Sequence, residues 1–252
     1  MLFLRTFGGL SLTGSENGVE AGVNGTRLSL LAFLAANPDG VRRDRIFLVF
    51  WGDSDQDRAR NALKQAVFAL RRFSGFPNII IGVDELRINQ EIVRADVVEF
   101  RTALRSGDLE KAVALYQGPF LDGVYVRAGA EFDQWRETEQ KKLINEYQSA
   151  LKQLAQRAHS KSDHESAIGY WKRLVESAPL DSRAVLGLIE ALNKGGDRAE
   201  ALSVARNHED LVRRELDIAP DKKITDAVFA MRASRTERSH DVPGRSSSDE
   251  RT

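Results

Sequence analysis

The alternation of apolar and polar positions is most regular between residues 54 and 73, SDQDRARNALKQAVFALRRF. Apolar side chains recur there at steps of three, four and one, at Ala59, Leu63, Ala66, Val67, Leu70 and Phe73. This spacing places them along one side of a helix of about five turns. Ser54 is expected to cap the N-terminus, and Asp57 follows three residues later in an arrangement like a capping box.

The other side of this helix is basic and polar. From Gln56 to Arg72 the chain carries five Lys or Arg side chains and one acid, Asp57, so the net charge is +4. Two interpretations follow from the helix alone. It is either a core helix whose basic face is solvated, which is common, or a helix that presents Arg, Lys, Asn and Gln to phosphates and base edges.

The neighbouring patterns favour the second interpretation. Short β-like and helical patterns predict two strands, three helices and a hairpin over residues 2–7, 10–13, 26–37, 41–50, 54–73 and 78–89. Residues 14–25, rich in Gly and Asn, predict a loop. Three helices with a basic third helix fit a helix-turn-helix, and the hairpin around Asp84 and Glu85 would be its wing.

From Asp96 onward the pattern becomes almost entirely helical. Seven helices are predicted, over residues 96–105, 110–117, 131–159, 162–177, 182–194, 197–215 and 221–233. A short motif recurs in this half, as GDLEKA at 107–112, SDHESA at 162–167 and GDRAEA at 196–201. Asp163 and Asp197 are 34 residues apart, which is the tetratricopeptide period. A generic helical bundle is the alternative, and repeats of this kind mostly bind proteins.

Composition limits the possible partners and the compartment. The 252 residues suffice for two modest domains, and 37 basic and 37 acidic side chains leave no net charge, so DNA affinity must come from a local patch. The absence of Cys fits a reducing cytoplasm. The N-terminal apolar run is broken by Arg5, and no apolar run reaches about 18 residues, so neither a signal peptide nor a membrane span is predicted. Residues 234–252 contain one apolar residue, Val242, and are expected to be disordered.

The motifs of catalytic, cofactor and metal sites are not found in this sequence. Gly8-Gly9 and Gly195-Gly196 are not followed by the GK[ST] of a phosphate-binding loop. The four histidines are His159, His164, His208 and His240. Their spacing does not indicate a metal site, and we expect them at the surface. We therefore predict that the protein is not an enzyme, and that it has no cofactor, no metal and no small-molecule substrate.

Seven segments together are typical of a known family: LRTFGGLSL (4–12), TRLSLLAFLAANPDG (26–40), RRDRIFLVFWGDSDQDRARNALKQAVFALRR (42–72), ADVVEFRTAL (95–104), LYQGPFLDGV (115–124), EFDQWRETEQKKL (131–143) and ELDIAPDKKITDAV (215–228). By their order and spacing, the chain resembles the bacterial transcriptional activator domain regulators of the antibiotic regulatory protein family. In that family an OmpR/PhoB-type winged helix precedes a tetratricopeptide-like activator domain. The resemblance covers about residues 2 to 231.

The resemblance implies an α fold with a small β component. A winged helix-turn-helix would occupy residues 1–94, an all-α tetratricopeptide-like domain residues 95–233, and a disordered tail or linker residues 234–252. It also implies a cytoplasmic bacterial transcription regulator, an activator, that binds double-stranded DNA as a homodimer. The loop at 50–56 would contact RNA polymerase.

Carried over by position, the DNA-contacting residues would be Arg58, Arg60, Asn61, Lys64, Gln65, Phe68, Arg71, Arg72 and, in the wing, Arg87. Phe68 and Ala69 depart from the family pattern of a small polar residue followed by Arg. Phe68 would touch a thymine methyl or pack against the second domain, and Ala69 removes a phosphate contact, which weakens affinity and its salt dependence.

The flanking acids Asp53, Asp55 and Asp57 would repel phosphates at the helix N-terminus. The middle and C-terminal half of the helix are therefore expected to read the DNA. The alternative function is a tetratricopeptide-like protein–protein interaction scaffold with a degenerate winged helix. The zero net charge and the two departures, Phe68 and Ala69, motivate it.

Overall fold

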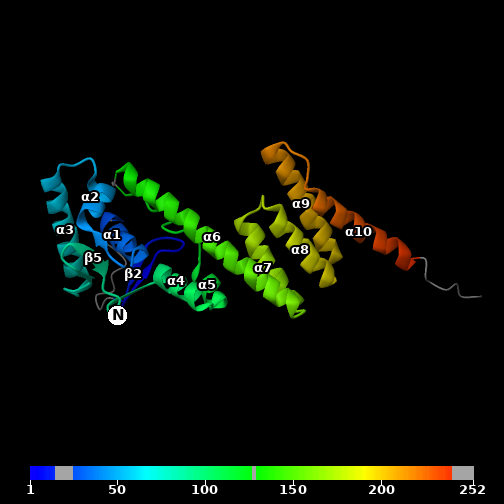
Figure 1. Cartoon of the computed structure of the whole chain (residues 1–252), viewed down its shortest axis with the longest axis horizontal. Coiled ribbons are helices and arrows are strands. Elements are labelled where there is room, and N and C mark those ends of the chain that lie inside the picture. The colour runs from blue at the N-terminus through cyan, green and yellow to red at the C-terminus, as the bar shows by residue number, and fades with distance from the viewer. Residues whose placement is uncertain (15–24, 127–128, 240–252) are drawn as a thin grey trace, which may run out of the picture. The chain divides into compact units, whose positions relative to one another are not determined.

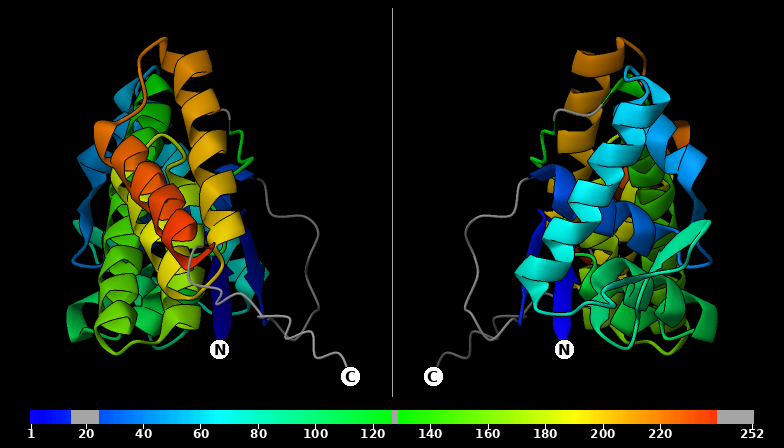
Figure 2. Two further views of the ribbon diagram at one scale, coloured as in Figure 1. Left: turned by 90° about the vertical axis from the view of Figure 1, so that its right-hand side faces the viewer. Right: turned by 90° about the vertical axis from the view of Figure 1, so that its left-hand side faces the viewer.

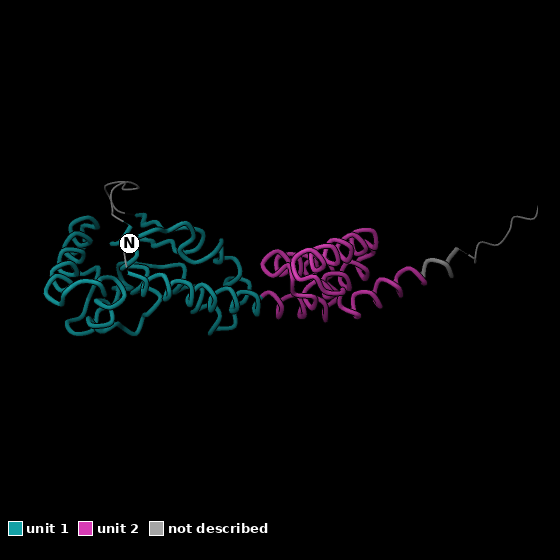
Figure 3. The backbone as a smooth tube through the Cα atoms, turned by 90° about the horizontal axis from the view of Figure 1, so that it is seen from above, with its two compact units in different colours: residues 1–150 teal, residues 151–252 magenta. Residues whose placement is uncertain are grey.

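The computed structural model describes residues 1–14, 25–126 and 129–239, with the side chains described up to residue 233 (Figure 1). The expected loop at 14–25 lies almost entirely outside the described residues, as does the part of the expected tail at 240–252. The chain divides into two compact units, Met1–Ala150 and Leu151–Thr252 (Figure 3).

A small sheet joins the start of the chain to a segment 91 residues later. β1 (Leu2–Arg5) lies between β2 (Ser11–Thr13), which is antiparallel to it, and β6 (Val93–Ala95), which is parallel. β1 and β2 confirm the two predicted strands. β6 was not predicted, because three residues carry too little pattern and its pairing partner is distant in sequence.

The winged helix-turn-helix is confirmed. Its helices are α1 (Gly25–Ala36), α2 (Arg43–Trp51) and α3 (Gln56–Ser74). Its wing is a three-stranded sheet in the order β3 (Val41–Arg42), β5 (Glu85–Ile88) and β4 (Ile80–Ile81). The expected helix start at residue 41 is wrong, since Val41 and Arg42 pair with Leu86 and Glu85 as an edge strand of the wing.

A chain of aromatic rings connects this fold to the helices that follow it. These are α4 (Asp96–Ser106), α5 (Leu109–Leu115) and α6 (Ala130–Ser160). Trp135 of α6 packs edge-on against Phe33 of α1, with ring centroids 4.7 Å apart, and Phe132 lies 5.2 Å from Phe50 of α2. The winged helix and the start of the helical domain therefore share one core, and the domain boundary at residues 94 and 95 stays a prediction.

The buried carboxylate of Asp96 fixes the start of α4 to the end of β1. It accepts hydrogen bonds from the backbone N–H of Thr6 at 2.8 Å, of Phe7 at 2.9 Å and of Val97 at 2.8 Å, and from the Thr6 hydroxyl. A buried charge is tolerated when several donors surround it. Loss of this side chain would leave three backbone N–H groups without their acceptor.

The second unit holds the remaining helices, which pack on one another in sequence order (Figure 1). α7 (His164–Ser177) packs on α8 (Ser182–Lys194), and α8 packs on α9 (Arg198–Leu216). α10 (Lys222–Ser239) packs on both α8 and α9. The expectation of disorder from residue 234 is wrong for 234–239, because α10 continues through them.

One histidine lies in the core of this unit. His208 is 4 % exposed, and its two ring nitrogens lie 3.1 Å from the Pro179 carbonyl and 3.1 Å from the Ser182 hydroxyl. The expected surface position is therefore wrong for His208. Its ring nitrogens have hydrogen-bond partners in Ser182 and Pro179, which are 26 and 29 positions away in the sequence. His159 and His164 are half-buried, and His240 lies outside the described residues.

The recurring motif marks the same turn three times. Each Asp caps a helix by accepting a hydrogen bond from the backbone N–H three residues later, at 3.2, 3.1 and 3.0 Å for Asp108, Asp163 and Asp197. Hydrogen bonds from the Ser166 side chain and from its backbone N–H lower the pKa of Asp163. Each motif's Ala is fully buried, as Ala112, Ala167 and Ala201. A small side chain at that position lets the neighbouring helix approach closely.

The residue before each capping Asp has left-handed backbone: Gly107 at φ 77°, Ser162 at φ 58° and Gly196 at φ 90°. A Cβ atom makes this conformation unfavourable, so Ser162 is strained where the other two turns have Gly.

We expect Ser162→Gly to raise the free energy of unfolding by about 1 kcal/mol, because it removes this strain. Urea denaturation measures this, and the reciprocal Gly196→Ser should lower stability. Equal stability of Ser162→Gly and the parent would contradict the strain.

Candidate nucleic-acid interface

α3 begins one residue later than the sequence indicated. The N-cap is Asp55, whose carboxylate accepts a hydrogen bond from the Arg58 N–H at 2.9 Å. Ser54 was wrongly expected to be the cap, because its own N–H donates to the Trp51 carbonyl in the preceding turn. The helix ends at Gly75, which has left-handed backbone at φ 73°.

The predicted apolar stripe of α3 faces the core. Ala59, Leu63, Ala66 and Leu70 are buried, and Val67 and Phe73 are half-buried. The other side of α3 faces outward in the first unit, where the helix is drawn in cyan (Figure 2, right). All nine residues expected to touch DNA are exposed: Arg58, Arg60, Asn61, Lys64, Gln65, Phe68, Arg71, Arg72 and Arg87.

The charged residues at the start of α3 are already paired. The Arg58 guanidinium lies 3.1 Å from the Asp55 carboxylate, and that of Arg60 lies 3.7 Å from the Asp57 carboxylate. Exposed pairs of this kind contribute little stability, so they can open for another anion. In the free protein, however, they leave the N-terminal turn of α3 with little excess positive charge.

The middle and the C-terminal half of α3 carry side chains that have no partner among the residues the structure describes. Within the described part of the chain, no hydrogen bond or ion pair engages the side chains of Asn61, Lys64, Gln65, Arg72 and Arg87. Helical spacing places the first four along one outward face. Arg71 differs from them, because its guanidinium donates to the Ile80 carbonyl at 3.3 Å and so ties α3 to the wing.

The wing is held in register beside α3. Ile80 pairs with Ile88, and Ile81 pairs with Arg87, so Arg87 lies across from the strand that Arg71 contacts. The turn lies at residues 82–84 and needs Gly82, at φ 104°, because a Cβ there would collide with the Glu85 carbonyl. The backbone N–H of Arg43 donates to the Asp84 carbonyl at 3.1 Å, which holds the turn against the start of α2.

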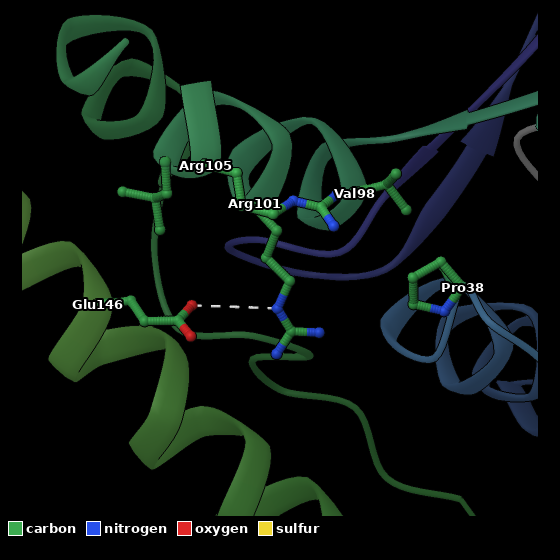
Figure 4. Close-up of a pocket in the computed structure, with 7 residues that line it drawn as sticks. Pro38, Val98, Arg101, Arg105 and Glu146 are labelled. Carbon is green, nitrogen blue, oxygen red and sulfur yellow. Dashed lines mark ion pairs between the residues drawn. The ribbon is translucent and has the colours of Figure 1, made fainter. Parts of the chain in front are cut away.

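Arg101 of α4 fixes the back of the winged helix to α6 (Figure 4). Its guanidinium donates to the Ala36 carbonyl at the end of α1 at 2.7 Å, pairs with Glu139, and lies 4.0 Å from the Glu146 carboxylate. Burial raises the pKa of Glu146, and the nearby Arg101 charge opposes that shift. The groove beside these groups measures about 400 Å³ and is lined mainly by Ala35, Pro38, Val98 and Leu104.

The described residues contain no cluster of three or more His, Asp or Glu side chains that could hold a metal ion. None of the helices in the described ranges is both long and apolar enough to cross a membrane.

The comparison with known families identifies the chain. The model of the bacterial transcriptional activator domain matches residues 86–231, which is more than half of the sequence. The chain belongs to the bacterial transcriptional activator domain family. The predicted family resemblance is thereby confirmed.

A solved structure has the same fold over most of the chain. Mycobacterium tuberculosis EmbR, determined in complex with a low affinity phosphopeptide, matches with a TM-score of 0.64 and 19 % sequence identity. The match covers 92 % of this chain and 65 % of the EmbR chain, so this chain spans less than two thirds of that structure's length. No curated protein sequence matches the chain.

The cap of α3 can be tested directly. We expect Asp55→Ala to lower the free energy of unfolding by about 1 kcal/mol, because the Arg58 N–H loses its acceptor. Asp55→Asn keeps an acceptor at the same place and is the matched control, with stability near that of the parent. Thermal or urea unfolding measures both variants. Equal losses in the two variants would indicate that the charge, and not the cap, stabilises α3.

Proposed function

We propose that this regulator binds double-stranded DNA by placing α3 in the major groove. The observation that carries the proposal is the outward row of Asn61, Lys64, Gln65 and Arg72, which have no partner among the described residues, on a helix packed by its opposite side. Lys and Arg suit phosphates and guanine edges, while Asn and Gln suit adenine edges. Membership of a transcription regulator family supports the same conclusion.

The charge distribution supports contact through the middle and C-terminal half of α3. Asp55 and Asp57 balance Arg58 and Arg60 in the first turns, whereas Lys64 and Arg72 face outward unbalanced. Arg87 in β5 extends this positive surface to the wing, where it would contact the DNA backbone. The acids Asp84 and Glu85 at the wing turn favour a backbone contact by Arg87 over insertion of the turn itself.

We further propose that two copies of the chain pair on a DNA repeat and that they contact RNA polymerase. The winged helix cannot shift freely against α4 and α6, because Arg101 and the aromatic rings hold it to them. A second copy bound through the helical domain would therefore set the spacing of two half-sites. The loop between α2 and α3 is exposed from Gly52 to Gln56 and is the surface that we assign to the polymerase.

Selection of bound DNA from a random pool tests the proposal first. We expect the full chain to enrich a direct repeat, with half-sites about 10–11 bp apart. Lys64→Ala combined with Arg72→Ala should lower affinity and reduce the slope of log K against log salt by about 1.8, since each lost phosphate contact contributes about 0.9. Lys141→Ala, which removes an exposed charge from α6, is the matched control and should leave affinity and slope unchanged.

The opposite result has a definite meaning. If no sequence is enriched, and if the weak binding that remains is insensitive to Lys64→Ala with Arg72→Ala, the DNA-binding proposal fails. The protein would then be a protein–protein interaction scaffold with a degenerate winged helix.

The polymerase contact has a separate test. We expect Asp53→Lys to lower transcription in vitro from a bound promoter several-fold while DNA affinity does not fall, because the change removes a negative charge near the DNA. Asp55 is unsuitable for this test since it caps α3. Asp39→Lys, an exposed acid before β3, is the matched control and should leave transcription unchanged. Loss of DNA binding together with activity would contradict the separation of the two surfaces.

A further inference from the structure

Phe68 is the apolar residue on the outward face of α3, and its side chain is 62 % exposed. Lys64 and Gln65 lie one turn before it, and Arg71 and Arg72 lie one turn after it. Phe68 is therefore surrounded on the helix surface by the polar side chains of the proposed DNA interface.

The core does not explain this side chain. At 100° per residue, Phe68 points away from the buried Leu63 and Leu70, and it joins no aromatic ring contact in the described part of the chain. Single exposed apolar residues are common on protein surfaces. What distinguishes Phe68 is its place at the centre of a row of unpartnered hydrogen-bond donors.

We propose that Phe68 reads the 5-methyl group of a thymine in the major groove, an inference that rests on the proposed DNA binding by α3. Thymine is the base that presents a methyl group there, and Phe is suited to contact it. Phe68 can therefore favour thymine through contact with its methyl group.

The neighbouring side chain narrows the site further. Gln65 precedes Phe68 by three residues, which is about 4.5 Å along the helix axis, close to one base-pair step of about 3.4 Å. A Gln side chain can bind the N6 and N7 edge of adenine with two hydrogen bonds. Gln65 and Phe68 are therefore assigned to neighbouring base pairs, an adenine beside a thymine.

Replacement of thymine by uracil isolates the methyl group, because uracil keeps every hydrogen-bonding group of thymine. In the DNA site selected by the full chain, each thymine is replaced in turn by deoxyuridine, and affinity is measured for the parent and for Phe68→Ala. For the parent, we expect about a fourfold loss at one thymine per half-site, the effect of burying one methyl group. For Phe68→Ala, the same replacement should have no effect.

A matched control is available within the chain. Phe229→Ala removes another exposed phenylalanine, 76 % exposed on α10, and should keep the fourfold sensitivity of the parent. The unfolding temperature of Phe68→Ala should equal that of the parent, because the side chain lies outside the core. Repeating the pool selection with Phe68→Ala should relax the preference for thymine at the same position.

The outcomes separate this inference from the proposed function. If the parent enriches no DNA sequence, the proposed function fails, and this inference fails with it. If the parent enriches a site but no thymine responds to uracil, or if Phe68→Ala responds like the parent, the inference alone is overturned. Phe68 would then be assigned to contact with a protein partner.

Discussion

The packing of Phe132 and Trp135 against Phe33 and Phe50 is the contact on which the first unit depends. Phe33 and Phe50 belong to α1 and α2, while Phe132 and Trp135 lie on the first turns of α6. A small winged helix buries limited apolar surface by itself. Completing its core with rings from the start of α6 stabilises the first unit.

Two polar contacts give this packing a definite geometry. Asp96 holds the end of β1 to the start of α4 through backbone donors, and Arg101 links the last turn of α1 to Glu139 of α6. Hydrophobic contact alone is not directional, whereas these buried bonds require specific positions of their partners. The starts of α4 and α6 therefore have fixed positions on the winged helix.

This arrangement leaves the outward face of α3 free. α3 packs on the core by its apolar stripe. Among the candidate DNA-contacting residues of α3, and within the described chain, Arg71 alone bonds to the wing, through the Ile80 carbonyl. Although the whole chain has no net charge, acidic and basic side chains are separated along α3. Asp55 and Asp57 are paired with Arg58 and Arg60, and the basic side chains without an ion pair in the described ranges, Lys64 and Arg72, lie further along the helix.

Local sequence determined what depends on near neighbours: the helical stripe of α3, the three capping Asp residues with their buried Ala, and the boundaries of α8. These features arise from helical periodicity and from hydrogen bonds that span three or four residues. Tertiary structure alone decided the pairing of β6 with β1, the strand at Val41, the burial of His208 and the packing of Trp135 against Phe33. Each of these depends on a partner distant in sequence, and a single sequence carries no local pattern that identifies such a partner.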